Sequence, residues 1–174
     1  PLPIGILPYQ VKIEPLAKVS FKNRLIKAMC IQRPGVGPQF KERREVTRKC
    51  KTVWRNCVSH RDKCTRVEFL DFLRKHSFCI CVHGNGIDPC PKAWEALSMG
   101  CIPIMKHSSL DEAYSRFPVV FVDSWDKKNI TLNKLQKWRD ELRPRFENPK
   151  LRAKVIKMLG VDYWWDIILS KLQS

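Results

Sequence analysis

The sequence predicts an α/β fold, in which a Rossmann-like parallel sheet is flanked by helices. Three short apolar runs of strand length indicate the sheet, at residues 78–82, 101–105 and 117–123. Helix-forming segments separate these runs, and Gly100 is expected to end the first helix before the second run begins. Strands that alternate with helices in this way are typical of parallel sheets covered on both faces.

The residues before this stretch extend the alternation. Residues 25–31 are expected to form a first strand, and the proline- and glycine-rich residues 33–38 a loop after it. Apolar spacing predicts one helix over 39–58 and another over 68–76. The second of these helices leads directly into the strand that begins at Phe78.

From Thr131 onward the chain is expected to be helical, in pieces divided by Pro144 and by the Asn148-Pro149 pair. With 174 residues, of which 44% are hydrophobic, the chain suits one domain with a substantial core. It contains no apolar run long enough to cross a bilayer. The expected parts are an entering linker over 1–20, the Rossmann-like domain over 21–150 and a C-terminal helix over 151–174 that packs on it.

A glycine-flanked turn follows the strand at 78–82. Gly84 and Gly86 enclose Asn85 at the carboxyl end of that strand, where open α/β sheets bind ligands. Glycines let backbone amides approach a ligand, and the next helix N-terminus favours phosphate. The turn is not a dinucleotide fingerprint, because the third glycine position holds Pro89, and no phosphate-loop motif occurs. A plain tight turn and a ligand loop are therefore both open.

Glu95 stands among packing residues near the expected start of the following helix. A carboxylate in a first helical turn often supplies only a favourable charge, worth about 0.3–1 kcal/mol. Acidic residues at nucleotide sites of this architecture also accept hydrogen bonds from ribose hydroxyls. Glu95 therefore has two candidate roles, a favourable charge near the helix start and an acceptor for ribose hydroxyls.

Polar residues also follow two of the predicted strands. His83 comes at the end of the strand at 78–82, and histidine titrates near pH 6.5, so it is a candidate for contact with a ligand. Ser108 and Ser109 lie in the polar loop after the next strand, where their hydroxyls and amides could meet a diphosphate or sugar. The structural alternative is that Ser109 caps a short helix.

The chain is strongly basic, with a net charge of +16 and a pI near 9.8. Residues 1–77 hold 18 Lys/Arg and 6 Asp/Glu (net +12), and residues 78–174 hold 15 and 11 (net +4). Such a charge favours polyanions, which include nucleic acid, heparan-like glycans, acidic membranes and nucleotide diphosphates. A nucleic-acid partner is not expected, because no ribonucleoprotein motif, zinc-finger spacing or leucine zipper occurs.

Cysteine is frequent, with eight residues. Cys57, His60 and Cys64 could share a helix face and so suggest zinc, but their spacing matches no recognised zinc motif, and no metal site is expected. A Cys57–Cys64 disulfide requires the helix to break between them, because seven helical residues rise about 10 Å. Cysteines on the buried strands are expected to be small core residues.

Five blocks of sequence, in order, resemble the donor-binding half of exostosin-like glycosyltransferases. The blocks are Phe78-Cys-Ile-Cys, Gly84-Asn-Gly-Ile-Asp88, Trp94-Glu-Ala-Leu, Gly100-Cys-Ile-Pro-Ile and Pro118-Val-Val-Phe-Val-Asp-Ser-Trp125. Members of this family have the two-domain GT-B fold and transfer a sugar from a nucleotide-sugar donor. The resemblance implies that this chain is one such half, and that an acceptor domain before it belongs to a longer enzyme.

The resemblance also implies roles for particular residues. Glu95 matches the glutamate that holds the donor ribose, and Asp88, seven positions earlier, would face the sugar. Arg43 matches an arginine that neutralises donor phosphate, although a solvated cationic helix face is the alternative. Relatives commonly have Asp-Thr-His-Arg before the tryptophan, whereas this chain has Asp88-Pro-Cys-Pro-Lys92. Lys92 is therefore the remaining cation, and it offers a point charge but no bidentate fork.

The expected function is transfer of a sugar from a UDP- or GDP-linked donor, with no further cofactor, to a glycan or protein acceptor. A Golgi or other secretory location would follow for a cellular enzyme of this kind, and Asn129-Ile-Thr131 is then a glycosylation sequon. The alternative is a non-catalytic basic module that binds acidic glycan or nucleic acid through residues 1–77.

Overall fold

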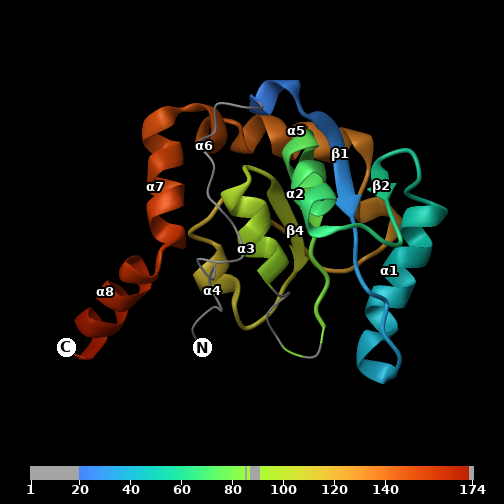
Figure 1. The fold of residues 1–174 in the computed structure, drawn as a ribbon, viewed down its shortest axis with the longest axis horizontal. Coiled ribbons are helices and arrows are strands. Elements are labelled where there is room, and N and C mark those ends of the chain that lie inside the picture. The colour runs from blue at the N-terminus through green and yellow to red at the C-terminus, as the bar shows by residue number, and fades with distance from the viewer. Residues whose placement is uncertain (1–19, 85, 87–90, 173–174) are drawn as a thin grey trace.

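The computed structural model describes residues 20–84, 86 and 91–172. Its centre is a five-stranded, all-parallel sheet with strand order β2-β1-β3-β4-β5, which confirms the predicted fold class (Figure 1). Each strand is therefore joined to the next one in the sequence by a crossover connection, and each of these connections contains a helix. The strands are β1 (Leu25–Cys30), β2 (Val58–His60), β3 (His76–Ile80), β4 (Ile102–Lys106) and β5 (Val120–Val122).

Helices cover both faces of the sheet. One face packs against α1 (Lys41–Lys51) and α5 (Leu132–Leu142) in a core around Trp54. The other face packs against α2 (Arg66–Lys75), α3 (Pro91–Ser98), α4 (Asp111–Tyr114) and α7 (Pro149–Leu159) in a core around Trp94. The remaining helices are η2 (Phe21–Asn23), η3 (Pro38–Phe40), η4 (Lys127–Asn129), α6 (Pro144–Glu147) and α8 (Val161–Leu172).

β2 is the one strand that the sequence interpretation missed. The helix expected over 39–58 ends at Lys51, and the chain turns before it enters the sheet beside β1. The turn forms because the Trp54 and Val58 amides donate to the carbonyls of Lys49 and Trp54, at 2.9 and 2.8 Å. Trp54, only 1% exposed, fixes the turn in the core. Tertiary burial of this tryptophan thus ends the helix.

The segment around β3 and β4 follows the prediction closely. All five residues of β3 are buried, as expected for a central parallel strand. Gly100 has φ of 76° after α3, and the Cys101 amide donates to the Ala96 carbonyl at 2.7 Å. That left-handed residue and backward hydrogen bond form a helix C-cap. The predicted glycine stop is confirmed.

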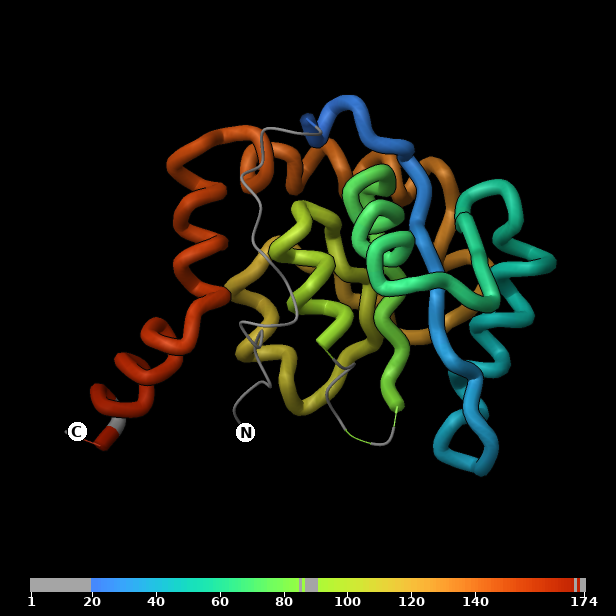
Figure 2. Tube along the Cα trace, in the orientation of Figure 1, coloured from blue at the N-terminus to red at the C-terminus, as the bar shows by residue number. Residues whose placement is uncertain are grey.

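The C-terminal part is divided as the prolines predict. Asn148 caps α7 through its side-chain oxygen, which accepts from the amides of Lys150 and Leu151. The single last helix expected over 151–174 is instead two, because Gly160 takes an extended conformation between α7 and α8. Figure 2 shows α7 and α8 on the opposite side of the molecule from α1. Among the described residues, no helix is long and apolar enough to cross a membrane.

Candidate functional site

The order of the strands identifies one edge of the sheet as the candidate site. From β1 the chain crosses to β2 on one side, and from β3 it proceeds to β4 and β5 on the other. In doubly wound sheets, a crevice outside the carboxyl ends of two such strands, here β1 and β3, is where ligands bind. The predicted site residues can be placed relative to this switch point.

Arg43 lies at this switch point. It stands in the first turn of α1, which begins at the carboxyl edge because α1 follows β1. Its Nε donates to the His83 carbonyl oxygen at 2.9 Å, and its Nη2 approaches the Val82 carbonyl oxygen at 3.4 Å. The guanidinium therefore reaches across from α1 to the carboxyl end of β3. This contact brings together two residues that the sequence singled out separately.

Gly84 makes room for this guanidinium. A Cβ added at Gly84 would lie 2.5 Å from Nη2 of Arg43 and 2.9 Å from its Cζ. Any side chain at this position would therefore push the arginine away from β3. Gly86, by contrast, is exposed, and a Cβ there would have nothing within 4 Å. Asn85 and Asp88 lie outside the described residues.

His83 is half-buried beside the same contact. Both of its ring nitrogens are inaccessible to solvent and have no hydrogen-bond partner among the described residues. A neutral imidazole carries one N–H donor and one acceptor nitrogen, and leaving such groups buried and unpaired costs about 1–3 kcal/mol. His83 thus has hydrogen-bonding capacity at the edge of the sheet that these residues do not use.

Glu95 lies in the second turn of α3, farther from the start than the sequence interpretation placed it. It is 6% exposed, and its Oε1 is 2.9 Å from Nη1 of Arg66, the first residue of α2. Because α2 leads into β3, its N-terminus also lies at the carboxyl edge. The ion pair gives the buried Glu95 carboxylate a partner inside the protein, which offsets the cost of its burial.

A second ion pair joins α1 to the end of β4. Nζ of Lys106, the last residue of β4, is 2.5 Å from Oε1 of Glu42 on α1. β3 lies between β1 and β4, so α1 contacts the ends of β3 and β4 through Arg43 and Glu42 respectively. Sequence reasoning missed Glu42 and Arg66, since nothing local to either residue indicates its partner.

Of the two serines after β4, Ser108 makes hydrogen bonds within the turn and Ser109 is exposed. Ser108 Oγ accepts from the Leu110 amide at 3.2 Å, and the Ser108 amide donates to Asp111 Oδ1 at 2.8 Å. The expected N-cap role of Ser109 is wrong: α4 starts at Asp111, its N-cap position is Leu110, and Ser109 is exposed. α4 has no side-chain N-cap, and the Asp111 carboxylate instead accepts from the Ser108 amide in the preceding turn. Lys92 lies in the first turn of α3 and is half-buried.

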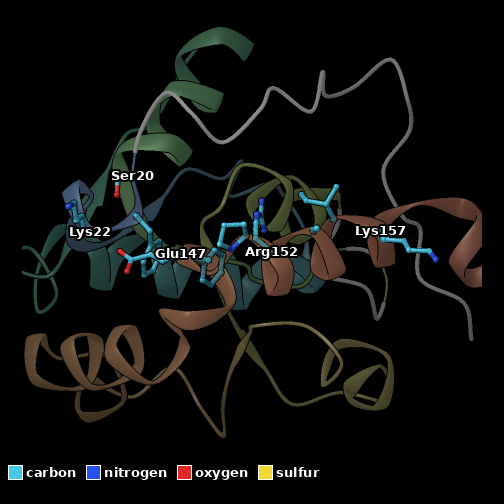
Figure 3. A pocket seen from close by; sticks show the side chains of 10 residues that line it. Ser20, Lys22, Glu147, Arg152 and Lys157 are labelled. Atoms are coloured by element: carbon cyan, nitrogen blue, oxygen red, sulfur yellow. The ribbon is translucent and has the colours of Figure 1, made fainter.

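A groove of about 770 Å³ lies elsewhere, beside η2, α6 and α7 (Figure 3). η2 precedes β1, so this groove is at the amino edge of the sheet, opposite the switch point. Its polar lining residues include Ser20, Lys22 and Arg152, and none of the predicted site residues that the structure describes lines it. Its position gives no support to the sequence interpretation.

The zinc interpretation of one helix face does not hold. His60 is the last residue of β2, and Cys57 lies in the turn before that strand, where its Sγ contacts the Ile130 carbonyl oxygen at 3.6 Å.

A scan against protein-family models finds no match for the chain, and a search of curated proteins finds no significant match. The fold and the contacts described above define a doubly wound parallel α/β domain in which a cation, Arg43, lies against Gly84 at the switch point.

Proposed function

We propose that this domain binds the nucleotide-sugar donor of a glycosyltransferase, which transfers the sugar to a glycan or protein acceptor. The observation that carries the proposal is the Arg43 guanidinium held over Gly84 at the β1/β3 switch point. Crevices at this position bind nucleotides in doubly wound sheets, and arginine matches phosphate geometry. The donor would be UDP- or GDP-linked.

The diphosphate would bind between Arg43, Lys92 and the main-chain amides of the turn that starts at Gly84. Fixed positive charge beside the bond that breaks stabilises the negative charge that develops on the leaving nucleotide. Arg43 is well suited to this, because its contacts with two backbone carbonyls hold the guanidinium in one orientation. His83, whose two ring nitrogens have no partner within the described part of the chain, would donate to or accept from the donor.

Glu95 would hold the ribose, and Asp88 would face the sugar. Arg66 pairs with the Glu95 carboxylate, and a carboxylate oxygen can accept hydrogen bonds from ribose hydroxyls. The same ion pair also explains the burial of Glu95 without any ligand, so the ribose role needs its own test. The acceptor side of the reaction would come from a second, N-terminal domain, as in two-domain GT-B enzymes.

A second candidate function is supported by the surface of α1. Lys41, Arg44, Arg48 and Lys51 are exposed along this helix. A row of exposed cations attracts polyanions such as acidic glycans through charge alone. The domain would then be a non-catalytic binding module, and nucleotide would not fill the switch point.

Isothermal titration calorimetry distinguishes the two functions. UDP-sugars, GDP-sugars and heparin are titrated into the wild-type protein and into Arg43→Gln and Arg48→Gln at two salt concentrations. The enzyme proposal predicts saturable nucleotide binding that depends weakly on salt and falls about tenfold or more in Arg43→Gln only. Binding of heparin alone, with a steep salt dependence and equal losses in both variants, favours the module. Arg48→Gln is the matched control, because it removes an exposed charge from the same helix.

A further inference from the structure

Two cysteines and one histidine meet beneath α1, near the β2 edge of the sheet. Cys30 ends β1 and His60 ends β2, and these two residues are paired in the parallel register. Paired residues on neighbouring strands project to the same face of a sheet. On that face α1 supplies Cys50, which is 2% exposed, while Cys30 is fully buried. One ligand atom from each of the three side chains lies within 4.8 Å of the other two.

We propose that Cys30, Cys50 and His60 form a binding site for a zinc-like divalent metal ion. Thiolate and imidazole are the preferred ligands of Zn²⁺, with bond lengths near 2.3 Å to sulfur and 2.0–2.1 Å to nitrogen. Tetrahedral coordination then separates the ligand atoms by roughly 3.5–3.8 Å. The ligand atoms lie within 4.8 Å of one another, so the cluster would have to contract by at most about 1 Å to reach that spacing. A water molecule would complete the four ligands.

The surroundings of His60 are those of a metal-binding histidine. Nδ1 lies 2.9 Å from the Cys30 carbonyl oxygen, on the side of β1, and Nε2 lies 3.1 Å from Oδ1 of Asp62. Metal-ligating histidines almost always donate their second ring N–H to a carboxylate, a carbonyl or water. Coordination through Nδ1 would replace its hydrogen bond to the Cys30 carbonyl oxygen, with a small turn of the ring, and would leave Nε2–H to donate to Asp62. Asp62 is itself held by Nζ of Lys51 at 2.7 Å.

The two sulfurs are close enough to share a hydrogen bond. That bond, with a weaker one from His60, lowers the pKa of the Cys30 thiol to about 6, and together with burial it raises the pKa of Cys50. Both cysteines bind a metal as thiolates, so metal binding releases to solvent the protons that the thiols still carry.

The site would fix the helix that carries the switch-point arginine. Cys50 follows Arg43 by seven residues, which is two turns of α1 and places both on the same side of the helix. A metal bonded to β1, β2 and α1 at once would stop the helix from sliding along the sheet. This inference stands apart from the nucleotide-sugar proposal: the metal site can be present without any donor binding.

Cobalt titration tests the site. The full chain is purified with reductant, treated with chelator and titrated with Co²⁺, whose thiolate complexes absorb in the near ultraviolet. We expect one Co²⁺ per chain with this absorption, displaced by Zn²⁺. Cys50→Ser and His60→Asn are expected to weaken binding by about 100-fold, and Asp62→Asn by about 10–100-fold. Cys57→Ser, a buried cysteine outside the cluster, is the control and is expected to bind as the wild type does.

Two further measurements keep the outcome decisive. Circular dichroism of each metal-free variant shows whether it folds, and Zn²⁺ is expected to raise the Tm of wild type and Cys57→Ser but not of Cys50→Ser. Absence of the cobalt–thiolate band in the folded, reduced wild type would overturn the proposal. So would an equal loss of affinity in Cys57→Ser. Peptide mapping that finds a native Cys30–Cys50 disulfide, with no metal bound after reduction, would also overturn it and assign the pair a covalent role.

Discussion

Arg43 and Gly84 fit each other: the guanidinium lies so near the glycine that a Cβ there would be 2.5 Å from Nη2. The pair joins the first turn of α1 to the end of β3, 41 positions later in the chain. This contact places a fixed cation at the switch point of the sheet, where a phosphate group would bind.

Gly84→Ala tests this relationship. The added methyl group would displace the Arg43 guanidinium, which ends a flexible side chain, so the cost in stability should stay below about 1 kcal/mol. Affinity for a UDP- or GDP-sugar is expected to fall about tenfold, measured by calorimetry. Gly86→Ala is the control, because open space surrounds that position. Equal donor affinity in both variants would show that the arginine position is irrelevant to binding.

The Arg66–Glu95 ion pair yields a prediction about stability. Glu95 is buried, while the Arg66 side chain is 44% exposed, so Arg66→Ala should lower the free energy of unfolding by about 1–2 kcal/mol, between the values for exposed and buried pairs. Urea denaturation measures this. Lys137→Ala, which removes an exposed pair with Glu141, should cost less than about 0.5 kcal/mol.

Glu95→Gln separates the two interpretations of this carboxylate. If Glu95 holds the ribose, the variant loses affinity for UDP by about tenfold but retains affinity for inorganic diphosphate. If the residue serves only the ion pair, stability changes while both affinities stay at their wild-type values. The ribose role would then have to be abandoned.

His76 is expected to make the stability of the fold decrease in acid. It is 2% exposed, its Nδ1 lies 2.8 Å from the Phe72 carbonyl oxygen, and Nε2 is buried without a partner among the described residues. Burial, with the nearby cations Lys27, Arg24 and Arg61, lowers the pKa of His76. The unfolded chain therefore binds more protons than the folded one below about pH 6.5, and stability falls as the pH drops through that value.

The substitution His76→Gln should remove the contribution of His76 to the pH dependence of stability. Unfolding curves of wild type and His76→Gln, recorded at pH 7.5 and pH 5, are expected to show a smaller loss of stability for the variant on acidification. The comparison between the two proteins cancels the other titrating groups. Parallel losses in both proteins would exclude His76 as a source of the acid sensitivity.

Arg24 is expected to stabilise the ends of two helices. Its Nη1 donates to the Leu73 carbonyl at 3.1 Å and its Nη2 to the Met99 carbonyl at 2.8 Å, at the C-terminal ends of α2 and α3. Arg24→Met keeps the apolar stem but leaves these carbonyls unpaired, which should cost about 1–3 kcal/mol in urea denaturation. Lys22→Met, on the same short segment, provides the comparison and should be nearly neutral.

The sequence predicted most of the sheet because its strands have clear local signals. β3 and β4 contain runs of buried apolar residues, with a glycine turn at Gly84 after β3 and Gly100 before β4, so pattern alone located them. β2 has three residues, of which Ser59 and His60 are polar; no strand was predicted there, and Val58 was placed at the end of the helix expected over 39–58. Only its pairing with β1 and the burial of Trp54 distinguish it, and both are tertiary effects.

The sequence identified several residues of the candidate site, but it did not indicate how they contact one another. Arg43, His83 and Gly84 were singled out by their positions after strands, and they do meet. Their mutual geometry depends on the crossing of α1 over the sheet, which no local pattern records. The partner of Glu95 and the cluster of Cys30, Cys50 and His60 escaped for the same reason. The cluster additionally required β2 to be recognised as a strand.

The most direct test of the central claim is a backbone amide NMR titration of the ¹⁵N-labelled protein with UDP- and GDP-sugars. Donor binding should give saturable shifts of the Arg43, Gly84 and Gly86 amides at the β1/β3 switch point, with little change beside Lys22 and Arg152 in the groove of Figure 3. Shifts confined to that groove, or no saturable shifts with any donor, would contradict it.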